Sequence, residues 1–325
     1  MPTHEVEVLA IGTASYDLSI FVDGFPRENS KLEIPEMLEG GGGPAANAAY
    51  LLSRWGVKCA FAGVLGNDMY GQRIAAEFEA AGTDFSLVEV REGHPTPLSV
   101  VLVNTLNGSR TIVNRKARLG ALELSAARLA EFPPQVLLFD GHEFGTARLA
   151  LELFGGAVSI LDAGSLRPGT EGLAGRVDYL VASERFAHQV TGLPDLANQN
   201  NCRECLRRMR DILRPGAIIV VTLGENGLIY EAEGACRHLP AYPARVVDTT
   251  AAGDVFHGAF AYGVLKKLSL EHTLKLACAA SSLSVRQRGG RQSTPSLDNV
   301  RKALRDAEGT GSPGLESVCR GQFQS

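Results

Sequence analysis

The segment with the clearest chemical potential spans residues 246–267 and reads VVDTTAAGDVFHGAFAYGVLKK. Its three small residues, Ala251, Ala252 and Gly253, precede Asp254 and an apolar pattern with helical spacing. Free N–H groups at such a helix start favour negatively charged oxygens, and an aspartate in the first turn can accept a proton from an attacking hydroxyl. An anion hole beside a general base suits phosphoryl transfer. From the residues alone, an ordinary helix N-cap is an equally good interpretation of Asp254.

A run of four glycines, Gly40 to Gly43, is the second candidate binding segment. It precedes Pro44 and an alanine-rich helical pattern, so its backbone amides are available to ligand hydroxyls or anions. The run matches the G-x-G-x-x-A dinucleotide pattern loosely. The nearest strong strand prediction, residues 5–11, lies far upstream instead of directly before the glycines, which leaves a dehydrogenase as a weak alternative.

The elements that must position these segments alternate between strand and helix patterns. Predicted strands lie at residues 5–11, 59–66, 135–140, 158–164, 177–183 and 217–224. Helical patterns lie between them, at residues 44–56, 71–82, 145–156 and 201–216. This alternation predicts an α/β fold with a doubly wound, mostly parallel sheet, whose functional loops follow the carboxyl ends of the strands.

Two segments do not fit the alternation. Residues 14–34 and 95–113 are rich in β-formers with tight turns, and Asn107–Gly108 is typical of a hairpin. We expect them to form a small sheet that acts as a lid, the alternative being an ordinary antiparallel edge of the main sheet. The prediction is therefore one domain over residues 1–308, followed by a disordered tail at 309–325.

Composition excludes several classes of protein. The net charge of −4 argues against a nucleic-acid partner. There is no apolar run long enough for a membrane helix and no signal-peptide pattern, so we expect a cytoplasmic protein without a membrane partner. Six irregularly spaced cysteines do not form a disulfide framework, and the Cys202–Cys205 pair is interpreted as reduced thiols.

The motifs together resemble those of the PfkB (ribokinase-like) carbohydrate kinases. DTTAAGD with its apolar helix resembles the C-terminal motif of that family, and GGGGPAANAAYLLSRWG with GNDMYG resembles the N-terminal one. The resemblance covers about residues 5–307 and implies a ribokinase-like fold with a β-sheet lid. It further implies transfer of phosphate from ATP, with Mg²⁺, to a primary hydroxyl of a small sugar, and a homodimer formed through the lid.

The resemblance also assigns roles to individual residues. Asp254 matches the catalytic base, and Ala251, Ala252 and Gly253 match the anion hole. The implied contacts to sugar hydroxyls are Asp17, Gly42, Gly43 and Asn47. The implied ATP loop contains Thr222, Gly224 and Gly227. The implied site for a monovalent cation such as K⁺ contains Asp248 and Thr250.

The chain departs from the family pattern at the N-x-x-E string associated with Mg²⁺ and phosphate. Residues 183–186 read S-E-R-F, which leaves Glu184 as the substitute carboxylate. The motifs look most like those of the sulfofructose kinase branch, whose polar groups for the sulfonate fall at Lys31 and Asn114. His142 lies where that branch has an arginine, so the acceptor remains a ketose, a sulfosugar or a similar furanose. The alternatives are a nucleoside kinase and a catalytically inactive sugar-binding or regulatory protein.

Overall fold

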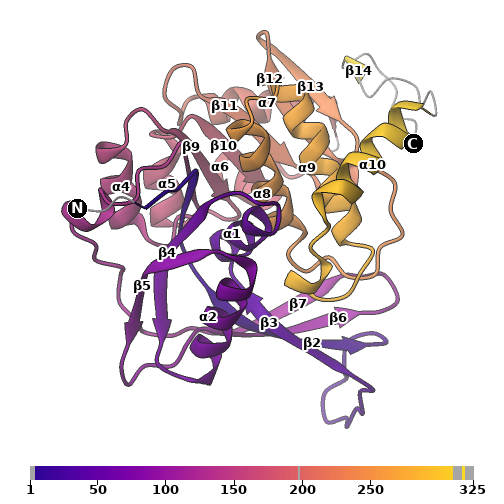
Figure 1. The fold of residues 1–325 in the computed structure, drawn as a ribbon. Coiled ribbons are helices and arrows are strands. Elements are labelled where there is room, and N and C mark those ends of the chain that lie inside the picture. The colour runs from indigo at the N-terminus through magenta and orange to yellow at the C-terminus, as the bar shows by residue number, and fades with distance from the viewer. Residues whose placement is uncertain (1–3, 197, 310–316, 319–325) are drawn as a thin grey trace.

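The computed structural model describes residues 4–196, 198–309 and 317–318. The predicted tail, residues 309–325, lies almost entirely outside the described residues. Within them, a large sheet with helices on both faces forms the body of the molecule, and a small sheet lies at one end of it (Figure 1).

The main sheet has ten strands in the described chain, in the order β14-β13-β12-β11-β10-β9-β8-β1-β4-β5. The neighbours from β11 to β5 pair in parallel, and β12, β13 and β14 pair antiparallel at the other edge. This confirms the doubly wound, mostly parallel sheet. The parallel strands are β1 (Val8–Ile11), β4 (Cys59–Gly66), β5 (Asp84–Arg91), β8 (Val136–Phe139), β9 (Val158–Ala163), β10 (Tyr179–Ser183) and β11 (Ile218–Thr222). The antiparallel strands are β12 (Leu228–Ala232), β13 (Ala235–Leu239) and β14 (Ser317–Val318).

Helices cover both faces because the central strands are apolar on both sides. In β1, Val8 and Ala10 belong to one buried cluster, whereas Leu9 and Ile11 belong to another, as the two-residue period of a strand requires. On the first face lie α1 (Pro44–Arg54), α2 (Met69–Ala81), α8 (Ala252–Leu265), α9 (Leu270–Ser284) and α10 (Leu297–Gly309). On the second face lie α3 (Ala126–Leu129), α4 (Phe144–Leu153), α5 (Pro168–Ala174), α6 (Glu184–Thr191) and α7 (Gln199–Arg210).

The small sheet is separate from the main one, so the segments expected to form a lid are not an edge of the main sheet. Its strands, in sheet order, are β3 (Met37–Gly42), β2 (Ser15–Val22), β6 (Leu98–Asn104) and β7 (Arg110–Arg115). The strand β3 is not predicted by the sequence, because glycines are unfavourable in strands. Here they are required, since a Cβ at Gly41 would lie 2.3 Å from Cζ of Arg291.

The hairpin turn of the small sheet contacts the segment that leads into α8. Gly108 adopts φ +72°, as the Asn-Gly turn predicts, and its carbonyl accepts a hydrogen bond from Thr249 N at 3.2 Å. Arg110 on β7 donates from Nη1 to Oγ1 of Thr249 at 2.8 Å. The small sheet is thereby attached to the loop that carries the predicted anion hole.

Candidate active site

The helices α1 and α8 bring two predicted site residues into direct contact. Asn47, in the first turn of α1, donates from Nδ2 to Oδ2 of Asp254, in the first turn of α8, at 2.7 Å. Asn47 is buried, and Asp254 is half-buried at the rim of the site. Burial raises the pKa of Asp254 above its ordinary value, and the Asn47 hydrogen bond and the positive charge of His257 act against that rise. A carboxylate so placed is a stronger base than an exposed aspartate.

Asp254 does not cap its own helix. The N-cap position is Ala251, in the left-handed region at φ 58°, without a side-chain cap hydrogen bond among the described residues. Ala252 N donates to the carbonyl of Thr249 at 3.3 Å, and the helical i→i−4 pattern begins with Val255 N donating to Ala251 at 2.9 Å. The amides of residues 253 and 254 precede that pattern and have no acceptor within the helix, which suits an anion.

The predicted acceptor contacts gather beside this pair. A Cβ at Gly42 would lie 2.2 Å from Oδ2 of Asp17, so β3 approaches the Asp17 carboxylate at backbone distance. Gly43 adopts φ +96°, and a Cβ there would lie 2.4 Å from the carbonyl oxygen of Thr13. Burial raises the pKa of Asp17, and the negative charge of Asp254 adds to that rise.

The two residues assigned to the sulfonate lie on the small sheet and in its connecting loop. Asn114 pairs in register with Ser99, and Ser99 pairs with Asp17, so Asn114 and Asp17 lie on the same face about 10 Å apart. Lys31 is exposed in the connection between β2 and β3. The structure thus aligns Asn114 with the acceptor residues but gives Lys31 no such alignment.

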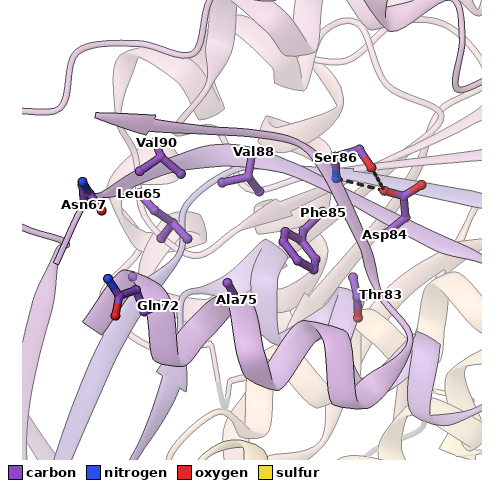
Figure 2. A pocket seen from close by; sticks show the side chains of 12 residues that line it. Leu65, Asn67, Gln72, Ala75, Thr83, Asp84, Phe85, Ser86, Val88 and Val90 are labelled. Carbon is purple, nitrogen blue, oxygen red and sulfur yellow. Dashed lines mark hydrogen bonds between the residues drawn. The ribbon is translucent and has the colours of Figure 1, made fainter. Parts of the chain in front are cut away.

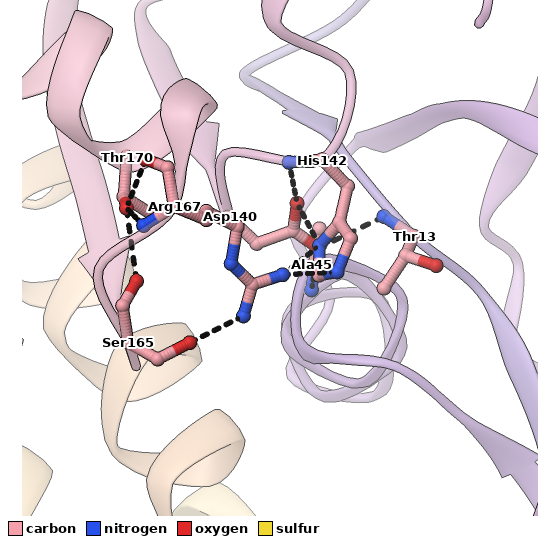
Figure 3. Close-up of polar contacts among 7 residues, drawn as sticks. All are labelled: Thr13, Ala45, Asp140, His142, Ser165, Arg167 and Thr170. Carbon is pink, nitrogen blue, oxygen red and sulfur yellow. Dashed lines mark hydrogen bonds and ion pairs between the residues drawn. The ribbon is translucent and has the colours of Figure 1, made fainter. Parts of the chain in front are cut away.

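Figure 3 shows how His142 is held at the carboxyl end of β8. Its Nδ1 lies 3.0 Å from Oδ1 of Asp140, and Nη1 of Arg167 contacts its Nε2. Asp140 is 3% exposed and also accepts hydrogen bonds from Thr13 N at 2.8 Å and from Ala45 N at 3.3 Å. Burial acts to raise the pKa of Asp140, but His142 and the backbone donors outweigh it and lower the pKa. The carboxylate therefore stays ionised and joins β1, β8 and the start of α1.

Sequence reasoning missed Asp140 and Arg167. The arginine expected at position 142 is absent there, yet the N-cap residue of α5, Arg167, brings a guanidinium to the same place from the next strand connection. A second donor of Arg167, Nη2, binds Oγ of Ser165 at 2.8 Å. The available signal was the position of each residue near the end of a predicted strand, because Asp140 ends the strand at 135–140 and Arg167 follows the strand at 158–164 by three residues.

A buried arginine supports Asn47 from behind. Arg291 is 5% exposed, and it donates from Nε to Oδ1 of Asn47 at 3.1 Å and from Nη1 to Oε2 of Glu77 at 2.7 Å. The Glu77 carboxylate in turn accepts from Gly41 N at 3.0 Å. These contacts form one chain from the strand β3 through Arg291 to Asn47 and the Asp254 carboxylate.

The predicted cation residues form a buried cluster of oxygen atoms. Asp248 is 1% exposed; its Oδ1 accepts from Thr250 N at 2.8 Å and its Oδ2 accepts from Gly289 N at 2.9 Å. Oγ1 of Thr250 is buried and has no hydrogen-bond partner among the residues that the structure describes. An orphaned hydroxyl beside a buried carboxylate matches the oxygen donors that hard cations take.

The predicted nucleotide residues lie where β10 and β11 end. Thr222 is the last residue of β11, and its hydroxyl donates to the carbonyl of Ala182 at 3.3 Å. Glu184 opens α6, beside the N-cap Ser183, and Phe186 is fully buried in the core. No group of three or more His, Cys, Asp or Glu residues in the described part of the chain is arranged to hold a metal.

A cavity of about 390 Å³ lies elsewhere, between α2 and the edge strand β5 (Figure 2). Phe85, Val88 and Ala75 line its apolar floor, and Asn67 and Gln72 lie at one end. It contains none of the predicted site residues, so it does not contribute to the arrangement around Asp254.

Comparison with known proteins agrees with this geometry. The model of the pfkB family carbohydrate kinases matches residues 6–297. A ribokinase from Lactococcus lactis is 27% identical over 93% of this chain and 98% of its own length. A putative ribokinase from Agrobacterium tumefaciens superposes with a TM-score of 0.83 at 28% identity, covering 94% of this chain and 99% of that one. The structure of Arabidopsis thaliana ribokinase complexed with ribose and ATP superposes with a TM-score of 0.78 at 24% identity, covering 93% of this chain and 99% of that one.

None of the described helices is long and apolar enough to cross a membrane.

Proposed function

This chain belongs to the pfkB family of carbohydrate kinases, and we propose that it transfers phosphate from ATP to a primary hydroxyl of a small furanose sugar or ketose. The observation that carries the proposal is the contact between Asn47 and Asp254. In support of it, Asp254 is half-buried beside the free amides at the start of α8, and its partner Asn47 lies on α1, directly after the glycines of β3. Base, acceptor site and anion hole then share one small volume, as in-line phosphoryl transfer requires.

In the proposed reaction Asp17 and the backbone around Gly42 and Gly43 hold the sugar hydroxyls. Asp254 accepts the proton of the attacking hydroxyl, with Asn47 fixing the orientation of its carboxylate. The amides of residues 253 and 254 stabilise the charge that develops on the transferred phosphoryl group. The small sheet, attached through Arg110 to Thr249, closes over the acceptor and excludes water.

Two cations fit residues of this site. Glu184 and the phosphates of ATP would hold Mg²⁺, which would neutralise phosphate charge. Asp248 and the orphaned hydroxyl of Thr250 would hold a monovalent cation such as K⁺ behind the anion hole. The loop with Thr222, Gly224 and Gly227 would contact the nucleotide.

We further propose that two copies associate through the small sheet and that the enzyme works in the cytoplasm, where ATP is abundant. All six residues of the edge strand β7 are exposed, including Ile112 and Val113. An exposed edge strand with apolar side chains offers free backbone groups to a second chain. The Arabidopsis relative with bound ribose and ATP supports the choice of acceptor and donor.

A second acceptor class is favoured by the contact between Arg167 and His142. The guanidinium of Arg167 is held by Ser165 and His142, in the loops that follow β9 and β8. A guanidinium is the preferred partner of planar or tetrahedral oxyanions. A sugar that carries a sulfonate, such as a sulfofructose, is therefore the second candidate.

The experiment is a coupled ADP-release assay with the purified chain over neutral pentoses, ketohexoses, sulfosugars and nucleosides, followed by ³¹P NMR of the product. The proposal expects one sugar class to give turnover far above the rate without acceptor, and a phosphomonoester on a primary carbon. Turnover restricted to nucleosides would contradict the proposed acceptor and would identify the chain as a nucleoside kinase. Absence of turnover with every acceptor, combined with ligand-induced thermal stabilisation, would identify an inactive sugar-binding protein.

A further inference from the structure

A buried histidine lies one helical turn behind the proposed base. His257 on α8 is 5% exposed, and its ring contacts residues of β9 and β10 in the main sheet. Its Nδ1 lies 2.7 Å from the carbonyl oxygen of Gly253 and 3.3 Å from Oδ2 of Asp162, at the end of β9. Its Nε2 lies 3.2 Å from the carbonyl oxygen of Val181, on β10.

These distances determine which protons the ring carries. A carbonyl oxygen only accepts hydrogen bonds, and a neutral imidazole has one N–H and one bare nitrogen. Carbonyl oxygens face both ring nitrogens of His257. In a neutral ring, the lone pair of the bare nitrogen would therefore point at a lone pair of one carbonyl oxygen, which is repulsive. The doubly protonated ring satisfies both contacts. The two contacts therefore favour the imidazolium form of His257.

A buried cation needs a compensating negative charge nearby. Asp162 supplies it, at 8% exposure and 3.3 Å from the ring. Burial raises the pKa of Asp162 to about 6, while the positive charge of His257 acts against that rise. When both groups are ionised, the pair carries no net charge.

The ring acts on the site through one peptide group. The carbonyl of Gly253, which His257 contacts, shares a peptide bond with the amide of Asp254. A positive charge at the oxygen end of a peptide pulls electron density from the nitrogen end and strengthens its N–H as a donor. That N–H is one of the two amides available to the phosphoryl group, so the ring polarises the anion hole from behind.

Other charges also face the Asp254 carboxylate. Arg110 from β7 and His257 favour its ionised form, and Asp140 from the end of β8 disfavours it. Asp17 on β2 is also negatively charged when ionised, and it and Asp254 disfavour each other's ionised form. His257 is the one of these cations that is fixed by three contacts inside the core, whereas Arg110 comes from the small sheet, the part of the fold proposed to move.

We propose that His257, held as an imidazolium by Asp162, is a positioning residue that polarises the 253–254 peptide and supplies a fixed positive charge behind the phosphate site. The inference rests on the proposed function for its catalytic consequence, but the charge of the ring is independent of it.

The first test needs no substrate. In protein labelled with ¹⁵N-histidine, both ring nitrogens of His257 are expected to show protonated shifts at neutral pH, with assignment by their loss in His257→Asn. In Asp162→Asn, which removes the compensating charge, the signal of one protonated ring nitrogen is expected to be lost under the same conditions. A ring that is a single neutral tautomer at neutral pH in the wild type overturns the proposal, whatever the kinase assay gives.

The second test measures the consequence for catalysis. His257→Asn keeps a donor toward Gly253 but removes the charge, and we expect kcat to fall about 10-fold or more while the KM for the acceptor changes less than about 2-fold. The acid limb of the kcat profile is expected to move to higher pH, because Asp254 loses a cation that favours its ionised form. His272→Asn, at an exposed position near the start of α9, is the matched control. A loss of kcat without the pH shift would indicate a structural role only and would overturn the proposal. Absence of turnover in the wild-type enzyme would instead count against the proposed function, and the NMR result would then decide the state of the ring.

Discussion

Asn47 and Asp254, 207 residues apart in sequence, are joined by a hydrogen bond of 2.7 Å from Nδ2 to Oδ2. The amide oxygen of Asn47 is in turn held by Nε of Arg291, so the side chain cannot rotate freely. The orientation of the proposed base thus depends on two helices and on a buried arginine from the segment after α9.

Replacing Asn47 tests this dependence. In Asn47→Ala the Asp254 carboxylate loses its donor, and we expect kcat to fall about 10- to 100-fold with ATP binding unchanged. Asn47→Asp places a second carboxylate at the same position, which is expected to raise the pKa of Asp254 and move the acid limb of kcat upward. Steady-state kinetics over pH measure both effects, with Asn299→Ala, at an exposed position of α10, as the control. Equal kcat in Asn47→Ala and the wild type would remove Asn47 from the site.

Arg291 is expected to matter for stability more than its neighbour Arg288. In Arg291→Met, Glu77 and Asn47 lose their partner inside the protein. Because the Glu77 side chain is 30% exposed and water can reach its carboxylate, we expect the free energy of unfolding to fall by only about 2 kcal/mol. Arg288 pairs with Glu36 at the surface, so Arg288→Met should change stability little. Urea unfolding of the two variants measures the difference. Equal midpoints would contradict the assigned role of the buried arginine.

Gly42 is expected to be intolerant of any side chain. A Cβ at this position would lie 2.2 Å from Oδ2 of Asp17, and the carboxylate would have to move. In Gly42→Ala we expect the KM for the acceptor to rise about 10-fold, with the KM for ATP unchanged. Gly156→Ala is the matched control, because a Cβ there meets no atom within 4 Å. A rise in the KM for ATP instead would assign Gly42 to the nucleotide.

The pH dependence of turnover follows from the raised pKa of Asp254. A general base must be ionised, so kcat rises with pH through the pKa of that group in the folded protein. Burial raises this pKa, which places the acid limb above the range of an ordinary aspartate near pH 4. Initial rates over a series of overlapping buffers measure it. A kcat that is constant down to about pH 4 would contradict the raised pKa.

Much of the fold follows from local pattern. The strands that became β1, β4 and β8 to β11 are short apolar runs, and α2 ends at Gly82 in the left-handed region, where the sequence predicts the stop. The strand β3 could not be predicted this way. Its glycines are required because the side chains of Asp17 and Arg291 lie so close to the strand that they leave no room for a Cβ. Such contacts depend on the packing of distant segments, which no local pattern contains.

The site shows the same division. The motif around Asp254 has a local signature, because an anion hole at a helix start is built from consecutive small residues. The roles of Arg291 and His257 have none, since Arg291 binds Asn47, 244 residues away, and the ring of His257 is fixed in part by Val181, 76 residues away. Only the folded chain brings Asn47, Arg291 and the carbonyl of Val181 to the residues they contact.

The most direct test of the account is the turnover of Asp254→Asn, measured with the best acceptor of the panel at saturating ATP. The substitution keeps the shape of the side chain and removes its capacity to take a proton. We predict that kcat falls about 1,000-fold while calorimetry shows acceptor and ATP binding within about 3-fold of the wild type. Near-normal turnover in this variant would show that Asp254 is not the base and would contradict the mechanism.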